Sequence, residues 1–158
     1  MEKLDFTVVE IKEDKIVFGL SKQSNDKTQA KDIPALSKKY YEAVGRNSGD
    51  VIPFFVISSD YDKGTKDFQL FIGGLIENTN IETFTILKGI YGKVTIKPKI
   101  GFMWGLSIGE AKRKFYTEWL PKSDYMPLNM EYEYHTEISK GKNPQIYILF
   151  AIGNANVL

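Results

Sequence analysis

The chain of 158 residues contains no cysteine and only one histidine, His135. Disulfides, thiol nucleophiles and cysteine-bound metals are therefore excluded. A metal site or a Ser-His-acid triad would depend on this single imidazole. The acids near it, Glu131, Glu133 and Glu137, follow at strand spacing on one segment, whereas metal sites usually draw ligands from several elements. We expect no metal, no cofactor and no catalytic triad.

Long apolar runs and an excess of one charge are also missing. No stretch approaches the roughly 20 apolar residues of a membrane helix, and the start, MEKLDFTVVEIKEDK, has no signal-peptide core. We therefore expect a soluble, cytoplasmic protein. The net charge is +1, so no global field attracts DNA or an anionic membrane. We expect no direct nucleic-acid partner and no membrane partner, and we interpret the basic run 112–114 as a solvated helix face.

The two halves of the sequence echo each other. The stretch around Phe6 (DFTVV) resembles the stretch around Phe84 (TFTIL), 78 residues later, and each leads into a second β-rich run, at 15–20 and 92–96. Two further strand-like runs end each half, at 51–58 and 67–76 in the first and at 129–136 and 145–152 in the second. Turn-rich segments join the runs of each pair.

A helix lies between the strands in each half. The first has Asp32 as a candidate N-cap, Pro34 in its first turn, apolar residues at helical spacing and Gly45 as a stop. The second begins with a capping-box pattern, Ser107 to Glu110, and carries a buried stripe that ends before Pro121. We predict an α+β fold, a tandem β-α-β-β repeat with pseudo-two-fold symmetry. The predicted unit is one domain, 1–158, with halves of about 1–78 and 79–158.

A groove is expected where two similar halves meet, because small-molecule sites favour concave junctions. The faces of the sheet turned away from the helices would line it. The segment 130–135 (MEYEYH) alternates strictly and so predicts a strand with two different faces. The acids of this segment either face solvent or line a pocket, and composition does not decide between the two positions. We expect Glu131, nearer the strand start, to be solvated.

Six segments, in order along nearly the whole chain, resemble the GyrI-like small-molecule-binding family, also found as the effector-binding domain of multidrug-responsive transcription activators. The segments are 33–36, 59–62, 84–91, 118–125, 132–134 and 146–148. The most specific is the Trp-x-Pro-x-Ser-x-Tyr pattern that runs from Trp119 to Tyr125. The resemblance implies the tandem β-α-β-β fold and a groove for bulky aromatic or amphipathic, often cationic compounds.

The resemblance also implies residue roles. Glu133 matches the buried glutamate that anchors the ligand, and Tyr147 matches an aromatic residue that contacts it. Tyr132 and Tyr134 would then pack on the helices, while Glu133 and His135 face the groove. From their positions before the second helix and in the first hairpin, Trp104 and Tyr61 are expected at the groove rim. The ligand-binding set is thus Glu133, Tyr147, Trp104, Tyr61 and His135.

Two positions depart from the family pattern, Ser37 where many relatives carry Trp and His135 where many carry Tyr. Both bear on the ligand rather than on the fold. We expect a stand-alone binding protein for sensing or sequestration, acting on transcription or gyrase, if at all, through a protein partner. One alternative is a hydrolase of cyclopropane-bearing toxins with Glu133 as general acid or base. Another is an interaction protein whose groove is filled by its own side chains.

Overall fold

A computed structural model describes residues 4–46, 54–97, 104–135 and 145–155, with the side chains of 104–106 excepted. The described elements follow in the order of two strands, a helix and two strands, twice over. The first set is β1 (Thr7–Ile11), β2 (Lys15–Asn25), α1 (Gln29–Ala43), β3 (Phe54–Ser59) and β4 (Asp67–Gly74). The second is β5 (Glu82–Ile86), β6 (Gly89–Ile96), α2 (Trp104–Lys114), β7 (Tyr125–His135) and β8 (Ile146–Asn154).

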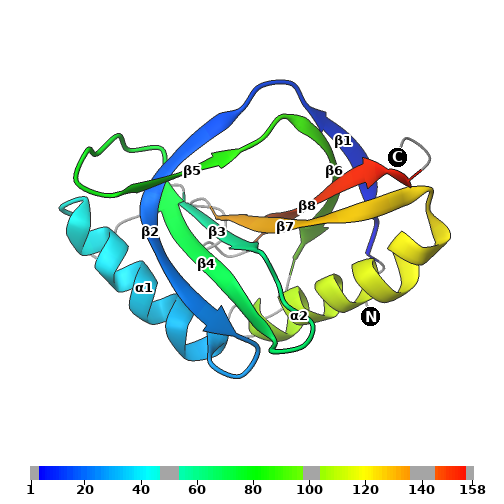
Figure 1. Ribbon diagram of the computed structural model, residues 1–158, viewed down its shortest axis with the longest axis horizontal. Helices are drawn as coiled ribbons and strands as arrows, with labels where there is room; N and C mark the ends of the chain where they lie inside the picture. The colour runs from blue at the N-terminus through cyan, green and yellow to red at the C-terminus, as the bar shows by residue number, and fades with distance from the viewer. Residues whose placement is uncertain (1–3, 47–53, 98–103, 136–144, 156–158) are drawn as a thin grey trace.

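All eight strands form one antiparallel sheet in the order β1-β6-β8-β7-β3-β4-β2-β5. Each strand of the first half has a counterpart four strands later: β1 and β5, β2 and β6, β3 and β7, β4 and β8. If every strand is exchanged with its counterpart, the same order results, read from the other end. This confirms the predicted pseudo-two-fold arrangement. The sheet curls into a half-barrel, and both helices lie outside the curl (Figure 1). β3 and β7 pair at the centre, where the two halves meet. Residues 51–53 and 136 of the predicted strands lie outside the described part of the chain.

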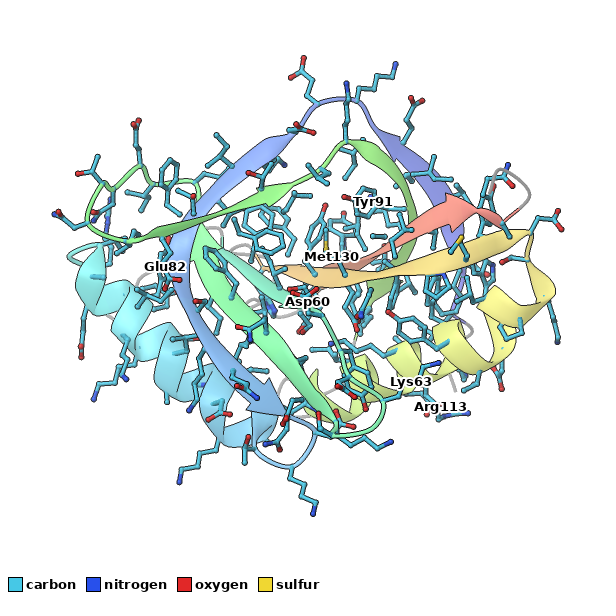
Figure 2. The ribbon with its side chains drawn as sticks, viewed as in Figure 1. Asp60, Lys63, Glu82, Tyr91, Arg113 and Met130 are labelled. Carbon is cyan, nitrogen blue, oxygen red and sulfur yellow. The ribbon has the colours of Figure 1, made fainter. Side chains whose placement is uncertain are left out.

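The two faces of the sheet have separate cores. Inside the curl, aromatic and aliphatic side chains from strands alone pack together, among them Phe55, Tyr91 and Tyr132. Tyr91 and Met130 are labelled within this interior in Figure 2. On the outer face, α1 packs through Leu36 and Tyr40 on β3 and β4. On the same outer face, side chains of α2 pack on β6 and β8 and form a separate apolar cluster.

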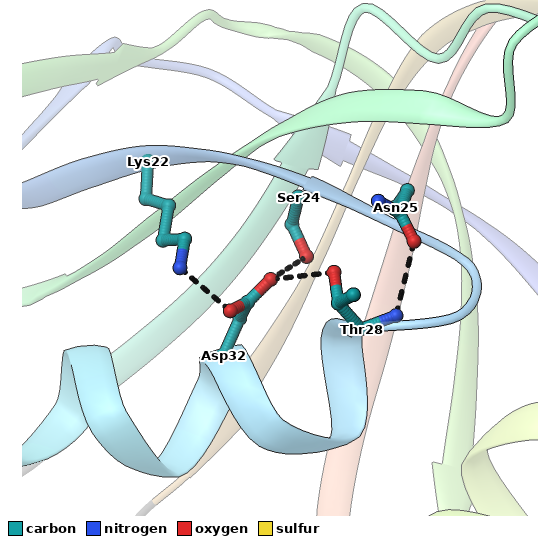
Figure 3. Close-up of polar contacts among 5 residues, drawn as sticks. All are labelled: Lys22, Ser24, Asn25, Thr28 and Asp32. Atoms are coloured by element: carbon teal, nitrogen blue, oxygen red, sulfur yellow. Dashed lines mark hydrogen bonds and ion pairs between the residues drawn. The ribbon is translucent and has the colours of Figure 1, made fainter.

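Helix α1 begins earlier than the sequence suggested. Thr28 occupies the position before the helix, and Asp32 lies in its first turn, so the prediction of Asp32 as the cap is wrong. The Asp32 carboxylate instead accepts hydrogen bonds from Lys22, Ser24 and Thr28 at 2.7–2.8 Å (Figure 3). These bonds tie the helix start to β2. Gly45, with φ of 70°, ends the helix as predicted.

Helix α2 likewise begins three residues before the predicted capping box. Ser107 is already helical, and Glu110 pairs with Arg113 and Lys114 rather than with the helix start. The helix continues as a π-helical turn, Phe115–Trp119, and a short 3-10 turn, Leu120–Lys122. Phe115 stacks on Phe150 of β8 with ring centroids 3.9 Å apart. In the described part of the chain, no helix is both long and apolar enough for a membrane span.

Candidate functional site

Two acidic side chains of β7 lie under helix α2. Glu131 and Glu133 share one face of the strand, as the alternation predicts, and this face is the one that the helices cover. Lys112 of α2 reaches down to both, with its Nζ 3.5 Å from Glu131 Oε2 and 3.6 Å from Glu133 Oε2. Glu133 exposes only 5% of its surface. A buried ion cluster therefore lies at the centre of the sheet.

The cluster contains two carboxylates, one ammonium and an imidazole. Two carboxylates share one ammonium, and His135 Nε2 lies 3.6 Å from Glu133 Oε1. Burial raises the pKa of Glu133, but the attraction of Lys112 and the contact with His135 outweigh it and leave that pKa below its ordinary value. Burial and the nearby Glu133 charge raise the pKa of Glu131 despite Lys112. Glu133 is thus the persistent anion, and Glu131 is the carboxyl that takes up a proton first.

Glu131 carries an unsatisfied acceptor. Its Oε2 is buried and has no hydrogen-bond partner among the described residues. Its Oε1 accepts a long hydrogen bond, 3.5 Å, from the hydroxyl of Tyr116. Buried polar atoms are normally paired, and the ammonium of Lys112, 3.5 Å from this oxygen, is the positive charge that stabilises it. The expectation that Glu131 is solvated is wrong, because α2 covers it.

The interior of the curl contains a separate cavity of about 260 Å³. It lies on the other face of β7, where Tyr132 and Tyr134 project together with Tyr147 of the neighbouring strand β8. The sequence interpretation had the two faces reversed, with Tyr132 and Tyr134 on the helices and Glu133 in the interior. The structure turns the acids to the helices, where Lys112 supplies a counter-charge.

Solved structures resemble the whole chain in fold. An integron cassette protein from Vibrio cholerae superposes with a TM-score of 0.68, at 14% identity, over 96% of this chain and 100% of that one. SAV2435 bound to tetraphenylphosphonium gives 0.67 at 9% identity, over 94% of each chain. The C-terminal domain of EcmrR gives 0.57 at 16% identity, over 96% of this chain and 98% of that one. EcmrR has also been solved in a complex with DNA, where the match spans 58% of its chain.

The chain has the GyrI-like fold. The sequence itself matches no protein-family model and no curated protein. The resemblance implied an α+β fold of two similar halves, and the curled eight-strand sheet with two helices agrees with it.

Within the GyrI-like fold, the predicted site residues fall into separate places. Glu133 and His135 lie together on the helix face, where His135 stacks on Phe54 with ring centroids 4.7 Å apart. Tyr147 lies on the opposite face, in the cavity. Tyr61 donates a hydrogen bond from its hydroxyl to Asp26 at 2.8 Å, at the far hairpin end of β3. Trp104 begins α2, and its side chain lies outside the described residues.

Two residues of the cluster escaped the sequence reasoning. Lys112 was assigned to a solvated face because it stands in the basic run 112–114. The signal for its burial is helical spacing, since Lys112 is four residues from both Ile108 and Tyr116, which contact the core of the GyrI-like fold. Glu131 was missed because a strand pattern shows which residues share a face, not what covers that face.

Residues 105–109 spell a Gly-x-Ser-x-Gly pattern around Ser107. A nucleophile elbow places such a serine on a sharp turn between a strand and a helix. Here all five residues lie within α2, so the pattern is not an elbow. The helix context removes the one sequence motif that could suggest acyl-transfer chemistry in this GyrI-like fold.

Proposed function

We propose that the chain binds bulky aromatic or amphipathic cations, with Glu133 as the counter-charge. The observation that carries the proposal is the cluster on β7, where the carboxylates of Glu131 and Glu133 share the ammonium of Lys112 under helix α2. A carboxylate shielded from water attracts a cation far more strongly than a surface acid does. Glu133, whose pKa stays low, keeps this charge at neutral pH.

Aromatic side chains beside the cluster suit a ligand with aromatic rings. The rings of Phe54 and His135 stack at an interplanar angle of 8°, and Tyr41 packs edge-on against Phe54. Offset stacking and cation–π contacts of this kind stabilise aromatic cations. The similar structure of SAV2435 contains tetraphenylphosphonium, an aromatic cation, which supports this ligand class.

The biological role that we propose is sensing or sequestration of such compounds. The likeness to EcmrR, solved in a complex with DNA, supports a link to transcription. The link that we propose passes through a protein partner, a regulator or gyrase.

A thermal-shift comparison of tetraphenylphosphonium with neutral triphenylphosphine oxide tests the proposal. At one hundred times its dissociation constant, the cation should stabilise the protein by ~2.7 kcal/mol, a shift of several degrees. Glu133→Gln should abolish the shift, because it removes the charge and keeps the shape. Glu118→Gln, at an exposed acid after α2, is the matched control and should respond like the wild type. Equal shifts with the neutral compound, or an unchanged response in Glu133→Gln, would reject the proposal.

A hydrolase remains the second candidate because one carboxyl of the cluster is suited to hold a proton. Burial raises the pKa of Glu131, which favours a general acid, whereas the lowered pKa of Glu133 suits a base. Mass spectrometry of reactive cyclopropane compounds after long incubation separates the candidates. A binding protein returns them intact, and a hydrolase consumes them in the wild type but not in Glu131→Gln.

A further inference from the structure

The cavity inside the curl differs in character from the acidic cluster behind it. Its floor is formed by side chains that are buried, among them Phe55, Tyr132 and Leu149. Its rim carries the half-buried Tyr147 and two lysines, Lys15 and Lys93. The cavity thus combines an apolar base with a polar, positively charged opening.

Among the described residues, the positive charge at this rim has no local counter-charge. None of the described lining residues is Asp or Glu, and neither lysine forms an ion pair with them or with any other described residue. Instead, Lys93 Nζ lies 4.2 Å from the centroid of the Tyr147 ring, and Lys15 Nζ lies 5.6 Å from that of Phe55. Cation–π contacts hold the ammonium groups over the cavity walls and leave their N–H donors available to an anion.

Tyr147 adds a neutral donor at the same opening. Its hydroxyl oxygen accepts a hydrogen bond from Gln145 Nε2 at 3.0 Å. The hydroxyl proton therefore points to another acceptor, and none is found for it among the described residues. A carboxylate at the rim would accept from this hydroxyl and from the ammonium groups, and bonds of this charge-assisted kind are the strong ones.

We propose that this cavity is a second ligand site, which binds a small aromatic carboxylate. The ring would lie on the apolar floor and the carboxylate would face Lys93 and Lys15. A dry cavity of about 150 Å³ accommodates benzene, so 260 Å³ suits a bicyclic ring. Strand β7 then separates a cation site on its helix face from an anion site on its interior face. The second site stands independently of the cation-binding proposal.

Isothermal titration of the full chain with three isosteric probes tests the second site. The probes are 2-naphthoate, the neutral 2-naphthamide and the cationic 2-naphthylmethylammonium. We expect naphthoate to bind roughly tenfold or more tightly than the amide, as one charge-assisted contact predicts. Lys93→Met and Lys15→Met should each remove most of this preference without weakening the amide. Added salt should also reduce it.

Control variants locate the binding. Lys12→Met alters an exposed lysine in the connection between β1 and β2 that does not line the cavity, and it should bind naphthoate like the wild type. Glu133→Gln should also leave naphthoate binding unchanged. Lys15 is exposed, so its variant folds even where Lys93→Met does not. Equal affinity for the three probes, an equal loss in Lys12→Met, or no naphthoate binding at millimolar concentration would overturn the proposal.

Discussion

Lys112 on helix α2 places its Nζ 3.6 Å from Oε2 of Glu133 at the centre of the sheet. The ammonium is thus an internal cation seated on the very carboxylate that we propose as the ligand anchor. Burial lowers the pKa of Lys112, but Glu131 and Glu133 outweigh this effect and raise it above the ordinary value. The lysine therefore stays charged, and a cationic ligand must share the two acids with it or displace it.

Removing this internal cation should destabilise the protein at neutral pH. Lys112→Met leaves two buried carboxylates with no ammonium, and breaking a buried ion pair in this way costs about 3 kcal/mol. Burial and mutual repulsion would then raise the folded-state pKa of both acids above their unfolded values. The loss is thus largest above those raised values and shrinks as falling pH protonates the acids.

Urea denaturation of Lys112→Met at pH 7 and pH 5 measures this effect. The matched control is Lys114→Met, two residues further along α2, which removes only a pairing with the exposed Glu110. It should change stability by less than about 0.5 kcal/mol. A Lys112→Met variant as stable as the wild type at pH 7 would mean that the acids are not buried together.

The same substitution should tighten cation binding. With the internal ammonium gone, the full charge of Glu131 and Glu133 is open to the ligand, and no competing group has to leave. We expect the affinity of Lys112→Met for tetraphenylphosphonium to rise roughly tenfold or more, which corresponds to ~1.4 kcal/mol. Titration calorimetry measures it, and Lys112→Arg, which keeps the charge, should bind no better than the wild type. A weaker cation affinity in Lys112→Met would show that the lysine helps to build the site.

Asp32 should make stability depend on pH in the acid range. Hydrogen bonds from Lys22, Ser24 and Thr28 lower its pKa from 3.8 to about 2. Since the folded value lies below the unfolded one, the stabilisation is complete above pH 3.8 and is lost as the pH falls toward 2. Asp32→Asn removes this contribution, so its urea midpoint should lie below that of the wild type at pH 5.

The difference in urea midpoint between Asp32→Asn and the wild type should disappear as the pH falls from 4 to 2. Asp5→Asn, at an exposed position near the start of the chain, provides the comparison and should track the wild type throughout. A gap that stays constant down to pH 2 would mean that shape rather than charge explains the effect of Asp32→Asn.

The sequence predicted the fold better than the site, for a physical reason. Alternation and helical spacing are local, and so the ten main elements and the two faces of the segment around Glu133 could be predicted. The predicted helix starts were less accurate. Asp32 and Ser107 are residue types that often cap helices, but Asp32 accepts a hydrogen bond from Ser24 of β2 and Ser107 lies inside α2. Which face of β7 meets the helices is a matter of contacts between distant segments. Lys112 contacts Glu133 from 21 residues away, and periodicity carries no information about that contact.

The position of α2, and with it Lys112, depends on a close contact with Gly92 of β6. A Cβ atom at Gly92 would lie 2.7 Å from Cε2 of Phe115, which is fully buried and cannot retreat. Gly92→Ala should therefore lift the helix and cost about 1–3 kcal/mol. Because the lift also moves Lys112 from the acids, the cation affinity should change together with stability.

The matched control for this contact is Gly109→Ala on α2. Outside the helix's own backbone, a Cβ there meets no atom of the described residues within 4 Å, and alanine is favoured over glycine inside a helix by up to ~1 kcal/mol. Chemical denaturation should thus show Gly109→Ala to be as stable as the wild type or more stable, and Gly92→Ala to be less stable. If both alanines raise stability, α2 does not rest on β6 through Phe115, and the position of Lys112 over the acids has another cause.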